Sequence, residues 1–202
     1  FAVFLLFLLR VAYNSALDLS SMKDPPRALW AVQPDHKYAA FLSHFKIEAA
    51  SEARYLRDLL HRILGTHIFL DSSELSDLRS LVTKGVALSD VLILLGTERV
   101  LSRPWCLIEI YEAAKAGTPV VIMPIVGKGF TVGRARAMMS DLEDTLEQLN
   151  PGAVLELDMY LMSDVSISRH GQVSCAALAQ LVTQPMMSCR FRQVSFAAIL
   201  PN

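Results

Sequence analysis

Short apolar runs alternate with longer segments of mixed polarity through the middle of the chain. Residues 91–95 and 120–125 are continuous apolar runs that are rich in β-branched side chains and too short for helices. Such runs are typical of strands in a parallel sheet that is buried on both faces. Residues 38–42 and 67–70 predict two earlier strands, and residues 153–157 predict a fifth.

The segments between these runs have helical spacing. In residues 48–64 the apolar positions recur every three or four residues and form one stripe, made of Ala49, Ala53, Leu56, Leu60 and Ile63. Residues 78–86 and 105–115 predict two more helices. Residues 134–149 predict a fourth, with inward side chains at Met138, Leu142, Leu146 and Leu149. This alternation predicts an α/β fold with a central parallel sheet of about five strands and helices on both faces.

The N-terminal part differs in character from this middle part. Residues 1–9 are wholly apolar, but a membrane-spanning helix needs about 20 residues. Three interpretations are open: the end of a membrane helix that begins before Phe1, the apolar core of a signal peptide, or a helix that packs on protein. Residues 17–35 contain three prolines and predict a linker.

The domain boundaries follow from these changes along the chain. Residues 1–36 form the apolar segment and the linker, and residues 37–157 form the compact domain. Residues 158–202 are a C-terminal extension that we expect to be helical and to complete or flank the domain. The chain starts at Phe1 rather than at a methionine, which indicates a piece of a longer protein.

Composition narrows the functional classes. The net charge is −1 with no long run of either sign, which gives no support for nucleic-acid binding. An apolar fraction of 52% argues against a disordered chain. The three cysteines are odd in number, which favours reduced thiols in an intracellular compartment. Neither the cysteines nor the histidines have metal-ligand spacing, so we expect no metal site and no bound cofactor.

Candidate binding residues follow the first predicted strand. Parallel α/β sheets bind ligands at the carboxyl ends of their strands, where Ser43 and His44 lie. Ser43 either supplies a hydroxyl to a ligand or caps the next helix, and His44 is either a binding or a structural residue. Phe45 either stacks on a base or belongs to the core. Lys46 is expected to meet a phosphate as a point charge.

Glu109 is the candidate catalytic residue. It lies in the predicted helix at residues 105–115, near the same edge of the sheet and one turn after Trp105. A carboxylate there can stabilise a developing positive charge on a substrate. The alternative is a solvated helix residue whose charge is balanced by Lys115 or Arg103.

Four sequence boxes resemble those of a Toll/interleukin receptor (TIR) domain, in the right order and spacing. They are FLSH at 41–44, FLD at 69–71, SDVLILL at 89–95 and SRPWCLIEIYEA at 102–113. The resemblance covers about residues 37–157 and implies a flavodoxin-like three-layer fold and a role in signalling. It also implies association with other TIR domains, as a homo-oligomer on activation. The domain would be cytoplasmic, and anchored to a membrane if the apolar N-terminal segment belongs to a membrane helix.

The resemblance also implies an activity. Many TIR domains cleave nicotinamide from NAD+ with a glutamate of the third helix, which by its position in the box is Glu109. Trp105 and residues 43–46 would then line the cleft for NAD+, which is a substrate and not a cofactor. However, this chain has Phe45 and Lys46 where related domains often carry an arginine. That departure keeps open a second interpretation, a catalytically silent scaffold with the same fold.

Overall fold

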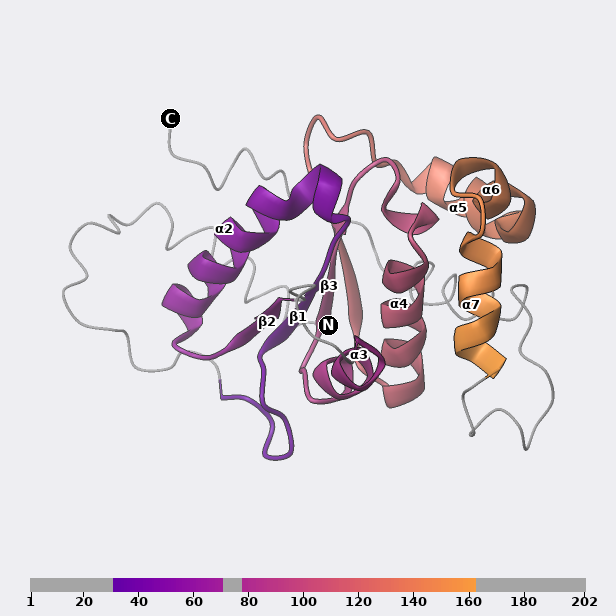
Figure 1. Ribbon diagram of the computed structural model, residues 1–202. Coiled ribbons are helices and arrows are strands. Elements are labelled where there is room, and N and C mark those ends of the chain that lie inside the picture. Colours follow the sequence, from indigo (N-terminus) through magenta and orange to yellow (C-terminus); the bar gives the residue numbers. More distant parts are fainter. Residues whose placement is uncertain (1–30, 71–77, 163–202) are drawn as a thin grey trace.

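A four-stranded parallel sheet lies at the centre of the part of the chain that the structure describes (Figure 1). The structure is a computed structural model, and it describes residues 31–70 and 78–162. The strands stand in the order β2-β1-β3-β4 and are β1 (Ala40–Ser43), β2 (Ile68–Leu70), β3 (Leu92–Gly96) and β4 (Val120–Pro124). All three neighbouring pairs are parallel. The four predicted strands up to residue 125 are thus confirmed.

Both faces of the sheet are buried, which explains why its strands read as continuous apolar runs. Successive side chains of a strand point to opposite faces. Phe41 and Leu94 therefore belong to one core cluster, whereas Leu42 and Leu95 belong to the other. All four side chains are completely buried.

Helices cover both faces, as the sequence predicted. α2 (Lys46–Leu64) packs on one face, and its predicted stripe is buried throughout. α3 (Leu78–Ala87) and α4 (Pro104–Ala116) cover the other face, and a further helix, α7 (Ala153–Met162), packs on the outer side of α4 (Figure 1). α2 and α4 each end at a glycine with positive φ, 66° at Gly65 and 72° at Gly117, which a side chain would strain. The result is the predicted flavodoxin-like α/β architecture.

The expected helix at residues 134–149 is instead two helices, α5 (Val132–Ser140) and α6 (Leu142–Leu149). They meet at Asp141, whose φ of −139° and ψ of 57° are not helical. No glycine or proline marks this break, so the apolar spacing alone suggested one helix. Leu149 was expected to point inward but is 52% exposed, whereas Leu142 and Leu146 are buried.

The fifth strand predicted at residues 153–157 is wrong, because this segment is the first half of α7. Its buried positions, Ala153, Leu157, Tyr160 and Leu161, recur every three or four residues, whereas Leu155 is 65% exposed. A short apolar run does not reveal its own period, and only the packing against α4 and α6 distinguishes helix from strand here. α7 also runs across the boundary that we placed after residue 157.

The apolar N-terminal segment lies outside the described residues, so its role as a membrane anchor stays a prediction. Among residues 31–70 and 78–162, no helix has both the length and the apolar character that a bilayer span requires. Most of the predicted C-terminal extension likewise lies beyond the described range.

Candidate functional site

The loops after β1 and β3 meet at the point where the strand order reverses. From β1 the chain passes outward to β2, whereas β3 returns to the other side of β1 and leads on to β4. Such a switch point, at the carboxyl ends of the strands, is where open α/β sheets form their binding crevice. Here it is bordered by residues 44–45 after β1 and by residues 97–103 after β3.

Two buried hydroxyl groups lie at this edge, on Ser43 and Thr97. Ser43 Oγ has no hydrogen-bond partner among the described residues. It does not cap α2 either, since Phe45 is the N-cap residue of that helix and no side chain caps it. Of the two roles expected for Ser43, the capping role is therefore wrong, and the role of a hydroxyl that meets a ligand stays a prediction.

Phe45 belongs to the core and is only 7% exposed. Two guanidinium groups from the loop after β3 lie over its ring, Arg103 at 4.8 Å and Arg99 at 5.6 Å from the ring centroid. A base could stack on this ring only after displacing an arginine. His44 and Lys46, on either side of Phe45, are partly exposed.

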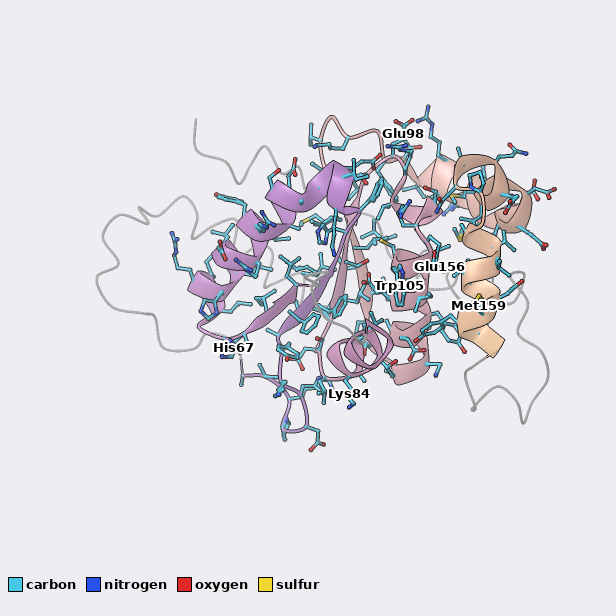
Figure 2. The ribbon with its side chains drawn as sticks, in the orientation of Figure 1. His67, Lys84, Glu98, Trp105, Glu156 and Met159 are labelled. Carbon is cyan, nitrogen blue, oxygen red and sulfur yellow. The ribbon has the colours of Figure 1, made fainter. Side chains whose placement is uncertain are left out.

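Ion pairs connect α2 and α5 to the loops after β3 and β4 at this end of the molecule. Glu48 of α2 accepts bonds from Arg99, at 2.9 Å from Nε and 3.2 Å from the backbone N–H. Lys128, in the loop after β4, pairs with Glu52 at 3.0 Å and donates to the backbone oxygen of Glu48 at 2.7 Å. Glu98, labelled at the end of the molecule where these loops meet in Figure 2, pairs with Arg134 at 2.7 Å.

These contacts perturb the acidity of Glu48. Burial raises the pKa of its carboxyl group, but contacts with the Thr97 hydroxyl and with Arg99 outweigh this, so the pKa lies below its ordinary value of 4.5. The Thr97 hydroxyl acts through proximity, because it does not reach hydrogen-bonding geometry. The stability that ionised Glu48 contributes is therefore present above pH 4.5 and is lost as the pH falls through the lowered folded pKa.

We therefore expect Glu48→Gln to lower the melting temperature at pH 7 but not in strong acid. An ion pair of this kind, with Arg99 half exposed, contributes about 1 kcal/mol or less. The melting-temperature difference between the variant and the parent should shrink as the pH falls below 4.5. A difference that stays constant between pH 7 and pH 3 would show that the Glu48 charge contributes nothing.

Glu109 lies in the second turn of α4 and is buried, with 3% of its surface exposed. The interpretation of Glu109 as a solvated residue is therefore wrong. Lys115 pairs with Glu112 at 3.4 Å, and Arg103 lies over the ring of Phe45. Burial is a common property of functional carboxylates, but it also separates Glu109 from a substrate in solution.

Trp105, which the TIR resemblance placed at the NAD+ cleft, is only partly buried. Its ring packs edge-to-face against Tyr160 of α7, with centroids 6.2 Å apart. The Tyr160 hydroxyl in turn donates to Glu112 at 3.1 Å. Trp105 thus joins α4 to α7 because α7 is a helix outside α4, which the sequence did not predict.

The main residues that the sequence reading missed as binding candidates are Arg99 and Arg103. We considered the first loop poor in arginine, but the structure brings two arginines to it from the loop after β3. A signal was present, since residues 97–103 also follow a strand and so lie at the carboxyl edge. The sequence did not show that Phe45 would attract them.

One group of solved structures supports this fold assignment. The TIR domains of the activated Roq1 resistosome, which directly recognizes the pathogen effector XopQ, match with a TM-score of 0.52 and 16% identity. The match covers 79% of this chain and 88% of that chain. No family model matches the sequence, and no curated protein does. At this identity the likeness concerns the fold alone, and the chain has a TIR-like fold.

Proposed function

We propose that this chain is a signalling module of the TIR type that associates with other copies of itself and cleaves NAD+. The observation that carries the proposal is the position of Glu109. Glu109 is the glutamate of the Trp-Cys-x-x-Glu box of the sequence. It is buried in the second turn of α4, the helix that follows the switch-point loop. The similarity to the Roq1 TIR domains supports the fold on which this assignment rests.

The proposed reaction breaks the bond between nicotinamide and ribose. The bonding pair leaves with nicotinamide, positive charge develops on the ribose, and water adds to the sugar carbon and releases a proton. The products are nicotinamide, ADP-ribose and H+. The Glu109 carboxylate would stabilise the developing charge, an effect that is large where water is excluded. No metal or cofactor enters this step.

The burial of Glu109 makes a specific demand on this proposal. At 3% exposure the carboxylate cannot meet a ribose in the arrangement described, so the α4 surroundings must open before reaction. We propose that association between copies favours the open arrangement. Confinement of many copies raises their effective concentration without any new contact. A module of this kind would be nearly inactive when dispersed.

The second candidate function is a catalytically silent scaffold. The observation that favours it is the same 3% exposure, since a glutamate that stays enclosed needs no substrate. In that case α4 would only present its surface for association, and Glu109 would be a structural residue of the helix.

The test is to incubate the full chain with NAD+, once dispersed and once concentrated on a multivalent support, and to measure free nicotinamide. We expect release from the concentrated sample and little or none from the dispersed one at equal protein amount. Nicotinamide release in neither sample would reject the NAD+ proposal and leave the scaffold. The oligomeric state of both samples, measured by light scattering, checks that concentration produced assembly.

A further inference from the structure

The side chain of Arg103 has no carboxylate partner among the described residues, although it is a half-buried cation at the switch point. We propose that Arg103, held on the ring of Phe45, binds a phosphate group of a nucleotide. The inference deepens the proposed function, because it names a phosphate-binding residue of the same site. It concerns binding rather than cleavage, so the two can fail separately.

Arg103 differs in this respect from three neighbouring cations. Each of those three is matched by a carboxylate. The pairs are Arg99 with Glu48 at 2.9 Å, Lys128 with Glu52 at 3.0 Å and Arg134 with Glu98 at 2.7 Å. In the part of the chain that the structure describes, the Arg103 guanidinium is seen only over the Phe45 ring, 4.8 Å from its centroid.

Phe45 fixes the position of this guanidinium without using its hydrogen-bonding capacity. A guanidinium that lies over an aromatic ring keeps its N–H donors directed outward in its own plane. Phe45 itself cannot move easily, because it is 7% exposed and belongs to the core cluster that includes α4. The donors of Arg103 are therefore presented as a fork whose geometry matches two phosphate oxygens.

The surroundings of Arg103 favour an anion. Arg103 directly precedes Pro104, the first residue of the 13-residue helix α4, and the amino end of a helix carries partial positive charge. The end of the neighbouring strand β1 contributes the buried Ser43 hydroxyl, which has no hydrogen-bond partner among the described residues. A buried polar atom without a partner is costly. A phosphate oxygen would satisfy the Ser43 hydroxyl once its surroundings open, which the burial of Glu109 also requires.

A nucleotide is the phosphate carrier that fits this position best. The guanidinium and the helix end select for phosphate, open α/β sheets bind their ligands at this switch point, and the proposed substrate NAD+ is itself a dinucleotide. With Arg103 over the Phe45 ring, that ring is not a stacking platform for the base. The phosphate would thus supply most of the binding, and the base would add selectivity outside the Phe45 contact.

The test measures binding of ADP, adenosine and pyrophosphate to the full chain by calorimetry at low salt. Arg103→Gln should weaken ADP binding by about ten- to a hundredfold, the usual loss for a charge-assisted hydrogen-bonding group. Arg103→Lys keeps the charge without the fork and should lose less. Arg134→Gln is the matched control, since it removes the same charge at the same edge from a residue that is 68% exposed and paired with Glu98. It should change ADP affinity less than about threefold.

The comparison of ligands identifies the carrier of the phosphate. ADP should bind at least about ten times more tightly than adenosine, because adenosine has no group for Arg103. Three results would overturn the inference: no ADP binding by the parent chain, equal losses in Arg103→Gln and Arg134→Gln, or equal affinities for ADP and adenosine. Pyrophosphate that binds as tightly as ADP would overturn the nucleotide as the ligand.

The ADP-binding and nicotinamide-release measurements distinguish failure of this inference from failure of the proposed function. If ADP binding depends on Arg103 while concentrated protein releases no nicotinamide, the phosphate site stands and the NAD+ cleavage falls. If nicotinamide is released but ADP binding is indifferent to Arg103, the cleavage stands and the phosphate site falls. Melting temperatures of the Arg103 variants should fall only slightly, since Arg103 forms no ion pair with a described residue and loses only its contact with Phe45. A cooperative transition near that of the parent shows that the variants are folded.

Discussion

Replacing Glu109 with glutamine should abolish nicotinamide release by the assembled chain, with a loss of roughly 10²–10³ in rate. Glutamine has nearly the shape of glutamate but no charge, so it fits the buried position in α4 and cannot stabilise positive charge on the ribose. The loss corresponds to removing one electrostatic stabiliser of a transition state, about 3–4 kcal/mol. Initial rates of nicotinamide release at saturating NAD+ measure it.

Glu112 supplies a matched control on the same helix. It is as well buried, at 4% exposure, but it faces α7 and accepts a hydrogen bond from Tyr160 at 3.1 Å. The amide oxygen of Glu112→Gln can keep that bond, and the Lys115 contact at 3.4 Å is at the helix surface. This variant should stay within a fewfold of the parent rate. Equal losses in both variants would show that buried charge in α4 matters for the fold, and Glu109 would lose its catalytic assignment.

Replacing Leu157 with alanine should destabilise the chain by about 2–5 kcal/mol, the usual cost of a cavity in a packed core. Leu157 is completely buried in α7, within the cluster that includes α4 and α6. A loss of this size is a large fraction of the stability of an ordinary domain. Chemical denaturation, followed by far-ultraviolet circular dichroism, measures the change in the free energy of unfolding.

Leu155→Ala is the control, and it separates the two structures considered for this segment. In α7, Leu155 is 65% exposed, so its truncation should cost less than about 0.5 kcal/mol. In the strand that the sequence predicted, residues 155 and 157 would point to the same face and their losses would be similar. Comparable losses for the two variants would therefore contradict the helix.

The sequence by itself determined most of the elements between residues 38 and 125. Val120, Val121 and Ile122 of β4 are apolar and β-branched and follow Pro119, and both faces of the strand are covered. The α2 stripe from Ala49 to Ile63 has the helical period over several turns, and all its members are buried. Patterns of this length predict secondary structure well, because every residue of a buried strand or of a one-sided helix contributes to the pattern.

The candidate site was predictable only as a location. The rule that ligands bind at the carboxyl ends of parallel strands indicated the edge that holds Ser43. It did not show which side chains converge there, because Phe45 and Arg103 are 58 residues apart in the sequence and meet only after β3 has paired beside β1. The same holds for Glu109, whose burial depends on the elements packed around α4 and not on its own helix.

Tertiary packing decided two features of the described chain after residue 125, the helical state of α7 and the break between α5 and α6. The segment 153–157 is too short to show a helical or strand period. The contacts of Tyr160 with Trp105 and Glu112 hold α7 as a helix against α4. The break at Asp141 likewise has no local signal and lets α5 and α6 pack in different directions. In a short segment, the intrinsic preference for helix or strand contributes less free energy than the tertiary contacts that the segment makes. The neighbouring helices, and not the local sequence, therefore select its structure.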